Sequence, residues 1–227
     1  MIQSLSFGTT SFAENPEPRL PCVLLLDVSG SMEGQPIAEL NAGLLTYVDA
    51  LAADSLASKR VEVALVTFGG EVRTVCDFTT ADAFLPPRLS AGGDTPMGAA
   101  IHQAIALLNR RKEVYRANGI SFFRPWIFLI TDGGPTDEWH SAADKVGVGE
   151  ANRSFAFFVV GVEGANFDVL QRICAARPPL KLKGLRFQDL FLWLSSSQAS
   201  QSRSRPGEWV PLQDPTGPQG WGAIPSI

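Results

Sequence analysis

Oxygen-bearing side chains follow two apolar segments of this sequence and recur once between them. The set comprises two aspartates, two serines and a threonine: Asp27, Ser29, Ser31, Thr95 and Asp132. Hard divalent cations prefer oxygen ligands and take few protein carboxylates, whereas softer metals need Cys or His. These residue types therefore predict a divalent-cation site that favours Mg²⁺ or Mn²⁺ over Ca²⁺. Its affinity should be weak because few of the ligands are charged.

Two apolar runs precede the two aspartates and should determine where these lie in the fold. Cys22–Leu26 and Trp126–Ile130 are too short for helices, so each is predicted to form a fully buried strand. Asp27 and Asp132 then lie at the carboxyl ends of these strands. Buried parallel strands belong to doubly wound sheets, in which ligands bind beyond the strand carboxyl ends where the winding direction switches. We therefore predict an α/β fold with a doubly wound, Rossmann-like, mostly parallel sheet.

The two serines are placed by local chain geometry. Ser29 and Ser31 are separated by one residue, so both hydroxyls point the same way from an extended turn. Asp and Ser are also common turn formers, and this segment alone would fit an ordinary loop at a strand end. The matching contexts of Thr95 and Asp132 favour metal binding over that simpler interpretation.

Helix-start signals surround the threonine and a further aspartate. An apolar stripe predicts a helix that begins at Met97, and either Asp94 or Thr95 is expected to cap it. Thr95 would thereby be held rigidly at a helix start. Asp137 is expected to cap a helix predicted over residues 138–151 rather than to bind metal.

Other segments complete the predicted sheet and its helices. Strands over residues 60–68 and 71–78, joined by Gly69-Gly70, predict a hairpin that places one antiparallel strand at a sheet edge. Periodicity predicts the remaining elements, which are helices over residues 35–53, 166–176 and 187–195 and strands over residues 154–162 and 180–182.

Length and composition indicate one folded domain with extensions. A chain of 227 residues with 45% hydrophobic content can bury a sizeable core. We place an N-terminal extension at residues 1–19, the domain at 20–195, and a Ser, Pro and Gly-rich tail at 196–227. The tail nevertheless carries large apolar side chains, so we expect part of Glu208 to Ile227 to pack on the domain or on a partner. These side chains are Trp209, Val210, Leu212, Trp221 and Ile224.

Charge and hydropathy exclude several classes of partner. The net charge is -4 and the basic residues are scattered, which gives no electrostatic footprint for nucleic acid or an anionic membrane. No apolar run approaches the roughly 20 residues that span a bilayer, and the start of the chain lacks a signal-peptide pattern. We therefore expect a cytoplasmic protein that binds neither nucleic acid nor membrane.

An enzymatic interpretation starts from Asp27. An aspartate at a strand end beside Mg²⁺ serves as the nucleophile in some phosphoryl-transfer enzymes. Such sites usually need a second acid near it and a lysine, and the positions after Asp27 are Val28, Ser29, Gly30 and Ser31. We expect no enzymatic activity, with Mg²⁺-dependent phosphoryl transfer through Asp27 as the alternative function. A purely structural cation site is a third interpretation.

The motifs resemble a known family. Asp27-x-Ser29-x-Ser31 with Thr95 and Asp132 is similar to the metal-ion-dependent adhesion site of von Willebrand factor A-type domains. Within that superfamily, the segments 24–32, 65–68, 91–98 and 131–137 resemble bacterial TerY-type tellurium-resistance proteins, over about Leu20 to Leu194.

The resemblance implies roles for individual residues. The hydroxyls of Ser29, Ser31 and Thr95 would bind the ion directly, and Asp27 and Asp132 would hold it mostly through water. A Glu or Asp carboxylate of a protein partner would complete the shell. The implied setting is a stress-response or metal-resistance system that includes kinases and phosphatases. Residues of the surrounding loops are expected to contact the partner, namely Met32, Glu33, Gly93, Asp94, Gly134 and Thr136.

Overall fold

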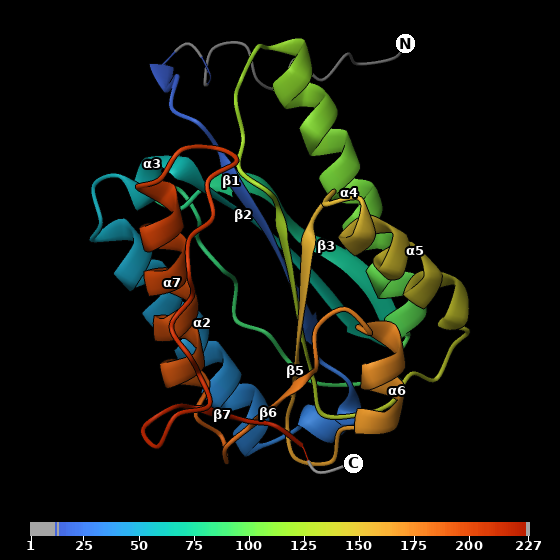
Figure 1. The fold of residues 1–227 in the computed structure, drawn as a ribbon. Helices are drawn as coiled ribbons and strands as arrows, with labels where there is room; N and C mark the ends of the chain where they lie inside the picture. Colours follow the sequence, from blue (N-terminus) through green and yellow to red (C-terminus); the bar gives the residue numbers. More distant parts are fainter. Residues whose placement is uncertain (1–11, 13, 226–227) are drawn as a thin grey trace, which may run out of the picture.

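The computed structural model describes residue 12 and residues 14–225, and its centre is a seven-stranded sheet (Figure 1). The spatial order of the strands is β3-β2-β1-β4-β5-β6-β7. β3 and β7, at the two edges, pair antiparallel with their neighbours, and the other pairs are parallel. The strands are β1 Leu20–Asp27, β2 Val61–Gly69, β3 Glu71–Thr80, β4 Trp126–Thr131, β5 Ala156–Gly161, β6 Leu180–Leu182 and β7 Gly222–Ala223.

Helices cover both faces of the sheet (Figure 1). One face packs against α2 Gln35–Ala52, α3 Ala57–Arg60 and α7 Phe187–Ser202. The other packs against α4 Met97–Ala117, α5 His140–Ala151 and α6 Phe167–Ile173. This arrangement confirms the predicted doubly wound α/β fold. Within the described ranges, no helix is long and apolar enough to cross a bilayer.

The burial of β1 explains why the sequences of the central strands are continuous apolar runs. All eight of its residues are buried, and their side chains alternate between the two faces of the sheet. Leu24 and Leu26 enter the core under α2 and α7, while Val23 and Leu25 enter the core under α4. A strand that is covered on both faces has no solvent side, so it shows no polar alternation.

The winding direction switches between β1 and β4. β2 lies on one side of β1 and β4 lies on the other, and the β1–β4 register brings Leu26 opposite Ile130. The carboxyl ends of these two parallel strands therefore meet at one edge of the sheet. Asp27 ends β1 and Asp132 directly follows β4, so the topology brings both aspartates to this switch point.

The C-terminal region differs from the sequence prediction in two ways. The last helix, expected to end at Ser195, continues to Ser202 as α7, because its buried face packs along α2 and the Tyr47 hydroxyl donates a 2.7 Å hydrogen bond to Gln198. Serine hydroxyls in this stretch also bond back to carbonyls of the preceding turn. The second antiparallel edge strand, β7, was not predicted, since its two residues carry no strand pattern.

Part of the tail packs on the domain, as its apolar residues predicted. Trp221 is only 3% exposed and contacts the Trp193 ring, whose Nε1 donates to the carbonyl oxygen of Gln213 at 2.8 Å. Trp209 is 86% exposed and contributes nothing to this packing. Residues 226–227 of the tail and 1–11 of the N-terminal extension lie outside the described residues.

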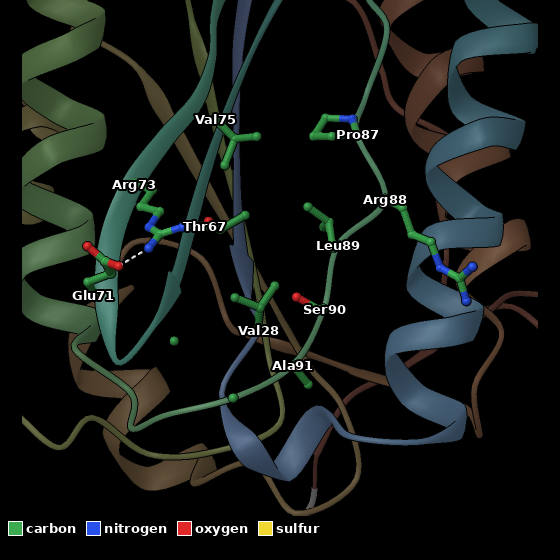
Figure 2. Close-up of a pocket in the computed structure, with 12 residues that line it drawn as sticks. Val28, Thr67, Glu71, Arg73, Val75, Pro87, Arg88, Leu89, Ser90 and Ala91 are labelled. Atoms are coloured by element: carbon green, nitrogen blue, oxygen red, sulfur yellow. Dashed lines mark hydrogen bonds and ion pairs between the residues drawn. The ribbon is translucent and has the colours of Figure 1, made fainter.

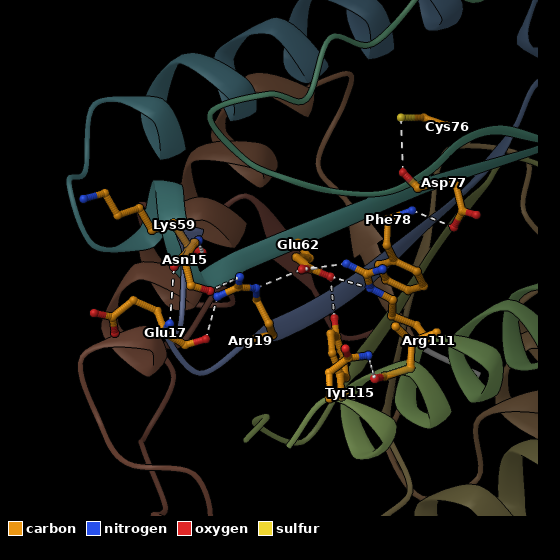
Figure 3. A network of polar contacts seen from close by, with 12 residues as sticks. Asn15, Glu17, Arg19, Lys59, Glu62, Cys76, Asp77, Phe78, Arg111 and Tyr115 are labelled. Carbon is orange, nitrogen blue, oxygen red and sulfur yellow. Dashed lines mark hydrogen bonds and ion pairs between the residues drawn. The ribbon is translucent and has the colours of Figure 1, made fainter. Parts of the chain in front are cut away.

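A buried ionic network fixes the opposite end of the sheet (Figure 3). The Glu62 carboxylate, near the start of β2, accepts hydrogen bonds from the guanidinium groups of Arg19 and Arg111 and from the Tyr115 hydroxyl. Arg19 is itself 1% exposed, so the chain is integral to the fold one residue before the predicted domain start. Phe12 lies against both guanidinium groups, which brings part of the predicted N-terminal extension onto this network.

The tail packing generates a stability prediction. Trp221→Ala should lower the free energy of unfolding by about 3–5 kcal/mol, because it removes a buried indole and leaves a cavity. Trp209→Ala is the matched control and should change it by no more than about 0.5 kcal/mol, since that ring is exposed. Urea unfolding of both variants measures the difference, and equal midpoints would show that the tail does not contribute to the core.

Candidate metal site

Asp27 is held in a fixed position at the end of β1. Its carboxylate is fully buried, and its two oxygens accept different hydrogen bonds. The backbone N–H of Ser29 donates to Oδ1 at 2.8 Å, and the Thr131 hydroxyl donates to Oδ2 at 2.5 Å. Thr131, the last residue of β4, was not among the predicted site residues. Its position beside Asp27 depends on the β1–β4 pairing, which no local pattern in the sequence reveals.

The two serines and Asp132 form a continuous chain of oxygens. The hydroxyls of Ser29 and Ser31 lie 3.0 Å apart, and the Ser31 hydroxyl donates to Asp132 Oδ1 at 2.8 Å. The structure therefore brings together Asp27, Ser29, Ser31 and Asp132 from segments that are about one hundred residues apart in the sequence.

Thr95 completes the group from a separate loop. Two backbone hydrogen bonds attach this residue to the loop that follows β4: its N–H donates to the Thr136 hydroxyl at 3.1 Å, and its carbonyl accepts from the Thr136 N–H at 2.9 Å. The Thr95 hydroxyl lies 3.8 Å from the point where a Cβ on Gly133 would stand. This position is next to Asp132, so Thr95 lies beside the other four predicted residues at the carboxyl ends of β1 and β4, and we refer to this group of five residues as the crevice.

Asp137 has a different role from the one predicted. Its carboxylate oxygens accept hydrogen bonds from the N–H groups of Gly98 at 2.9 Å and Ala99 at 2.8 Å, so it caps α4 and not α5. Neither Asp94 nor Thr95 caps α4, contrary to our expectation, and this leaves the Thr95 hydroxyl available to the site. The loop after β4 crosses the start of α4, where a carboxylate is favoured by the helix dipole. α5 instead receives Glu138 at its first N–H groups.

Two glycine pairs hold the Thr95 loop against the end of β1. Gly93 has a φ of 78°, and a Cβ there would lie 2.4 Å from the backbone nitrogen of Gly70. The N–H of Gly30 donates to the Gly93 carbonyl, and the N–H of Gly70 donates to the Asp94 carbonyl, both at 2.8 Å. The turn between β2 and β3 is thus part of the site's support. The repeated Gly-Gly pairs were the available sequence signal for it.

The predicted partner-contacting residues divide into two groups. Glu33, Gly93, Asp94 and Thr136 are exposed around the crevice, and Gly134 is half-buried. Met32 is fully buried in the core between the sheet and α2, so its side chain has no surface to offer a partner. Met32 ends a short 3-10 helix, Gly30–Met32, which turns the apolar side chain inward.

The electrostatics of the site fit a bound cation. Burial raises the pKa of Asp27 against the hydrogen bonds from Ser29 and Thr131, and the nearby Asp132 carboxylate raises it further. Burial also raises the pKa of Asp132. In the part of the chain that the structure describes, neither carboxylate forms an ion pair with Lys, Arg or His, although buried charges are normally paired or coordinate metals.

The donor set consists mainly of hydroxyl groups. Across the described residues, no group of three or more His, Cys, Asp or Glu side chains could hold a metal ion. Two carboxylates and three hydroxyls remain as candidate ligands, and this all-oxygen chemistry suits a hard cation such as Mg²⁺ or Mn²⁺.

The glycine contacts generate a test of the loop. Gly93→Ala should lower the free energy of unfolding by about 1–3 kcal/mol, because the residue has a left-handed conformation and its Cβ would meet Gly70. Gly92→Ala is the control, since a Cβ there meets nothing within 4 Å. Urea unfolding compares the two, and a Gly93→Ala variant as stable as Gly92→Ala would contradict the described packing.

Solved structures share the fold at low sequence identity. A von Willebrand factor type A protein from Catenulispora acidiphila matches with a TM-score of 0.61 and 18% identity, over 81% of this chain and 43% of that one. The pilus adhesin SpaC from Lactobacillus rhamnosus GG, in its open conformation, matches with a TM-score of 0.63 and 16% identity, over 82% and 30%. Proximal thread matrix protein 1 from the mussel byssus matches with a TM-score of 0.56 and 16% identity, over 81% and 48%.

This chain spans less than half the length of each of these proteins. A search of curated proteins gives no match. The family model of the von Willebrand factor type A domain matches residues 22–187, which include all five residues of the crevice. The chain therefore belongs to the von Willebrand factor type A domain family.

Proposed function

We propose that this domain binds a divalent cation, Mg²⁺ or Mn²⁺, and through it captures an acidic side chain of a protein partner. The residues that would hold the ion are Asp27, Ser29, Ser31, Thr95 and Asp132. Von Willebrand factor type A domains commonly bind a divalent metal and are generally interaction modules rather than enzymes. The bound ion would supply an electrophilic centre to which an incoming carboxylate is attracted.

The observation that carries this proposal is a pair of buried carboxylates to which no cationic side chain of the described residues is paired. Asp27 and Asp132 lie at neighbouring strand ends, and hydroxyls rather than guanidinium or ammonium groups link them. Burying two like charges in this way is unfavourable unless a cation offsets it. The loop residues Glu33, Asp94 and Thr136 near these carboxylates are exposed, so a group from outside could approach them.

The hydrogen bonds of Asp27 argue against its use as a nucleophile. One of its oxygens accepts from the Ser29 N–H and the other from the Thr131 hydroxyl, and the side chain has no exposed surface. A nucleophilic carboxylate needs an oxygen that faces the substrate. We therefore favour binding over phosphoryl transfer.

The proposed setting follows from the TerY-type motifs. We place the domain in a cytoplasmic stress-response or metal-resistance system, where a kinase or phosphatase of the same system is a candidate partner. The scattered basic residues and the net charge of -4 favour a protein partner over nucleic acid or an anionic membrane.

The metal site is tested by direct titration. Titration calorimetry should detect Mn²⁺ binding to the wild-type chain, and Asp132→Ala should abolish it, because it removes a carboxylate in contact with Ser31. Asp94→Ala is the matched control: this aspartate precedes Thr95 but is exposed, and its loss should leave most of the affinity. Unchanged binding in Asp132→Ala would reject the site.

Partner capture is tested by affinity purification with mass spectrometry. Proteins retained in Mn²⁺ should be lost in EDTA and with Thr95→Ala, which removes a ligand hydroxyl from a loop separate from Asp27 and Asp132. Thr95→Ser keeps the hydroxyl and should restore capture. If the same proteins are retained in EDTA and by Thr95→Ala, any ion at this site has a structural role only.

A further inference from the structure

A cavity of about 360 Å³ lies beside the crevice, between the β2–β3 hairpin and the segment Pro87–Gly92 (Figure 2). Strand residues form one wall, including Thr67 of β2 and Val75 of β3, while the segment forms the other. Val75 is 37% exposed although it is apolar. The strand wall therefore combines one partly exposed apolar side chain, Val75, with Thr67 and the Glu71–Arg73 ion pair, and residues 87–92 form the opposite wall.

The segment Pro87–Gly92 presents a free edge of main chain. It is not part of a helix or strand, and the Asn41 side chain of α2 holds it by accepting from the Leu89 N–H at 2.8 Å and donating to the Leu89 carbonyl at 3.0 Å. Arg88 and Ser90 flank Leu89 and line the cavity, and their backbone groups form no hydrogen bond within the described part of the chain.

The cavity is lined by residues that are neighbours of the metal-site residues in the sequence. Val28, which lines the cavity, stands between Asp27 and Ser29, and its carbonyl accepts from the Gly92 N–H at 2.8 Å. The same segment then runs directly from Ser90 to Thr95. A chain that places an acidic side chain in the crevice would therefore have its neighbouring residues beside this free edge.

We propose that the cavity binds an extended segment of the partner, adjacent to the acidic residue that the crevice captures. This inference rests on the proposed function and specifies its partner: a segment that pairs its main chain with Arg88 and Ser90 and packs an apolar side chain against Val75. Main-chain pairing supplies affinity in such strand additions, and side-chain pockets supply specificity. The occupant is thus an extended stretch of protein and not an isolated carboxylate.

The test uses immobilised short peptides, each with a central Glu and varied flanking residues, in the presence of Mn²⁺. The wild-type chain should select particular flanking residues, including an apolar one. Ser90→Pro removes one main-chain donor and should lower affinity for the selected peptides about 2- to 10-fold, as expected for one hydrogen bond. Ser90→Ala keeps the N–H and should bind as wild type.

A second pair of variants acts from the opposite wall. Val75→Trp should fill the cavity and reduce peptide binding, whereas Val75→Thr has nearly the same shape and should retain most of it. Calorimetry with Mn²⁺ should give the wild-type affinity for all four variants, since none of them is a candidate ligand.

The outcomes separate this inference from the proposed function. The cavity does not bind the partner segment if Mn²⁺-dependent binding is the same for all flanking residues, or if it persists in both Ser90→Pro and Val75→Trp. Either outcome would still be compatible with capture of a carboxylate. If the chain binds Mn²⁺ but no peptide, both the groove and the capture of an acidic side chain are rejected.

Discussion

Asp27 and Asp132 are buried acids at the ends of adjacent strands, and no cationic side chain of the described residues pairs with either. At the opposite end of the same sheet, the charge of a buried acid is compensated in a different way. There Glu62 accepts hydrogen bonds from two guanidinium groups and a tyrosine, so its charge is compensated within the fold. The charge of the buried acid is therefore compensated at one end of the sheet, while at the other end we propose that a bound cation supplies the compensation.

The loops around the crevice are held mainly by contacts of their backbone. Their side chains are therefore available for other interactions. Gly93 and Gly70 approach so closely that a Cβ would not fit, and Asp137 satisfies the first N–H groups of α4. Thr95 is placed by its backbone hydrogen bonds to Thr136, and among the described residues its hydroxyl forms no hydrogen bond. A hydroxyl can serve as a metal ligand in such a site only if other groups hold its loop in place, and here the backbone does so.

The features that could be predicted from the sequence are those encoded in short stretches of chain. Apolar runs fixed β1 and β4, and the oxygens that follow them identified Asp27 and Asp132. The errors concern contacts between distant segments: Asp137 caps α4 across the crevice, and Met32 turns into the core. The continuation of α7 likewise depends on its packing against α2, which local propensity does not report.

How strongly the proposed site attracts a partner's carboxylate should depend on how much of the site's own negative charge acts on the bound cation. Both oxygens of Asp27 already accept hydrogen bonds from Ser29 and Thr131, which draws part of its charge away from a cation in the crevice. Hydroxyls of Ser29 and Ser31 add no charge of their own. A cation held in this way would keep more of its attraction for an outside carboxylate than one surrounded by acids. The same hydrogen bonds that position Asp27 thus favour weak metal binding and strong attraction of a partner's acid.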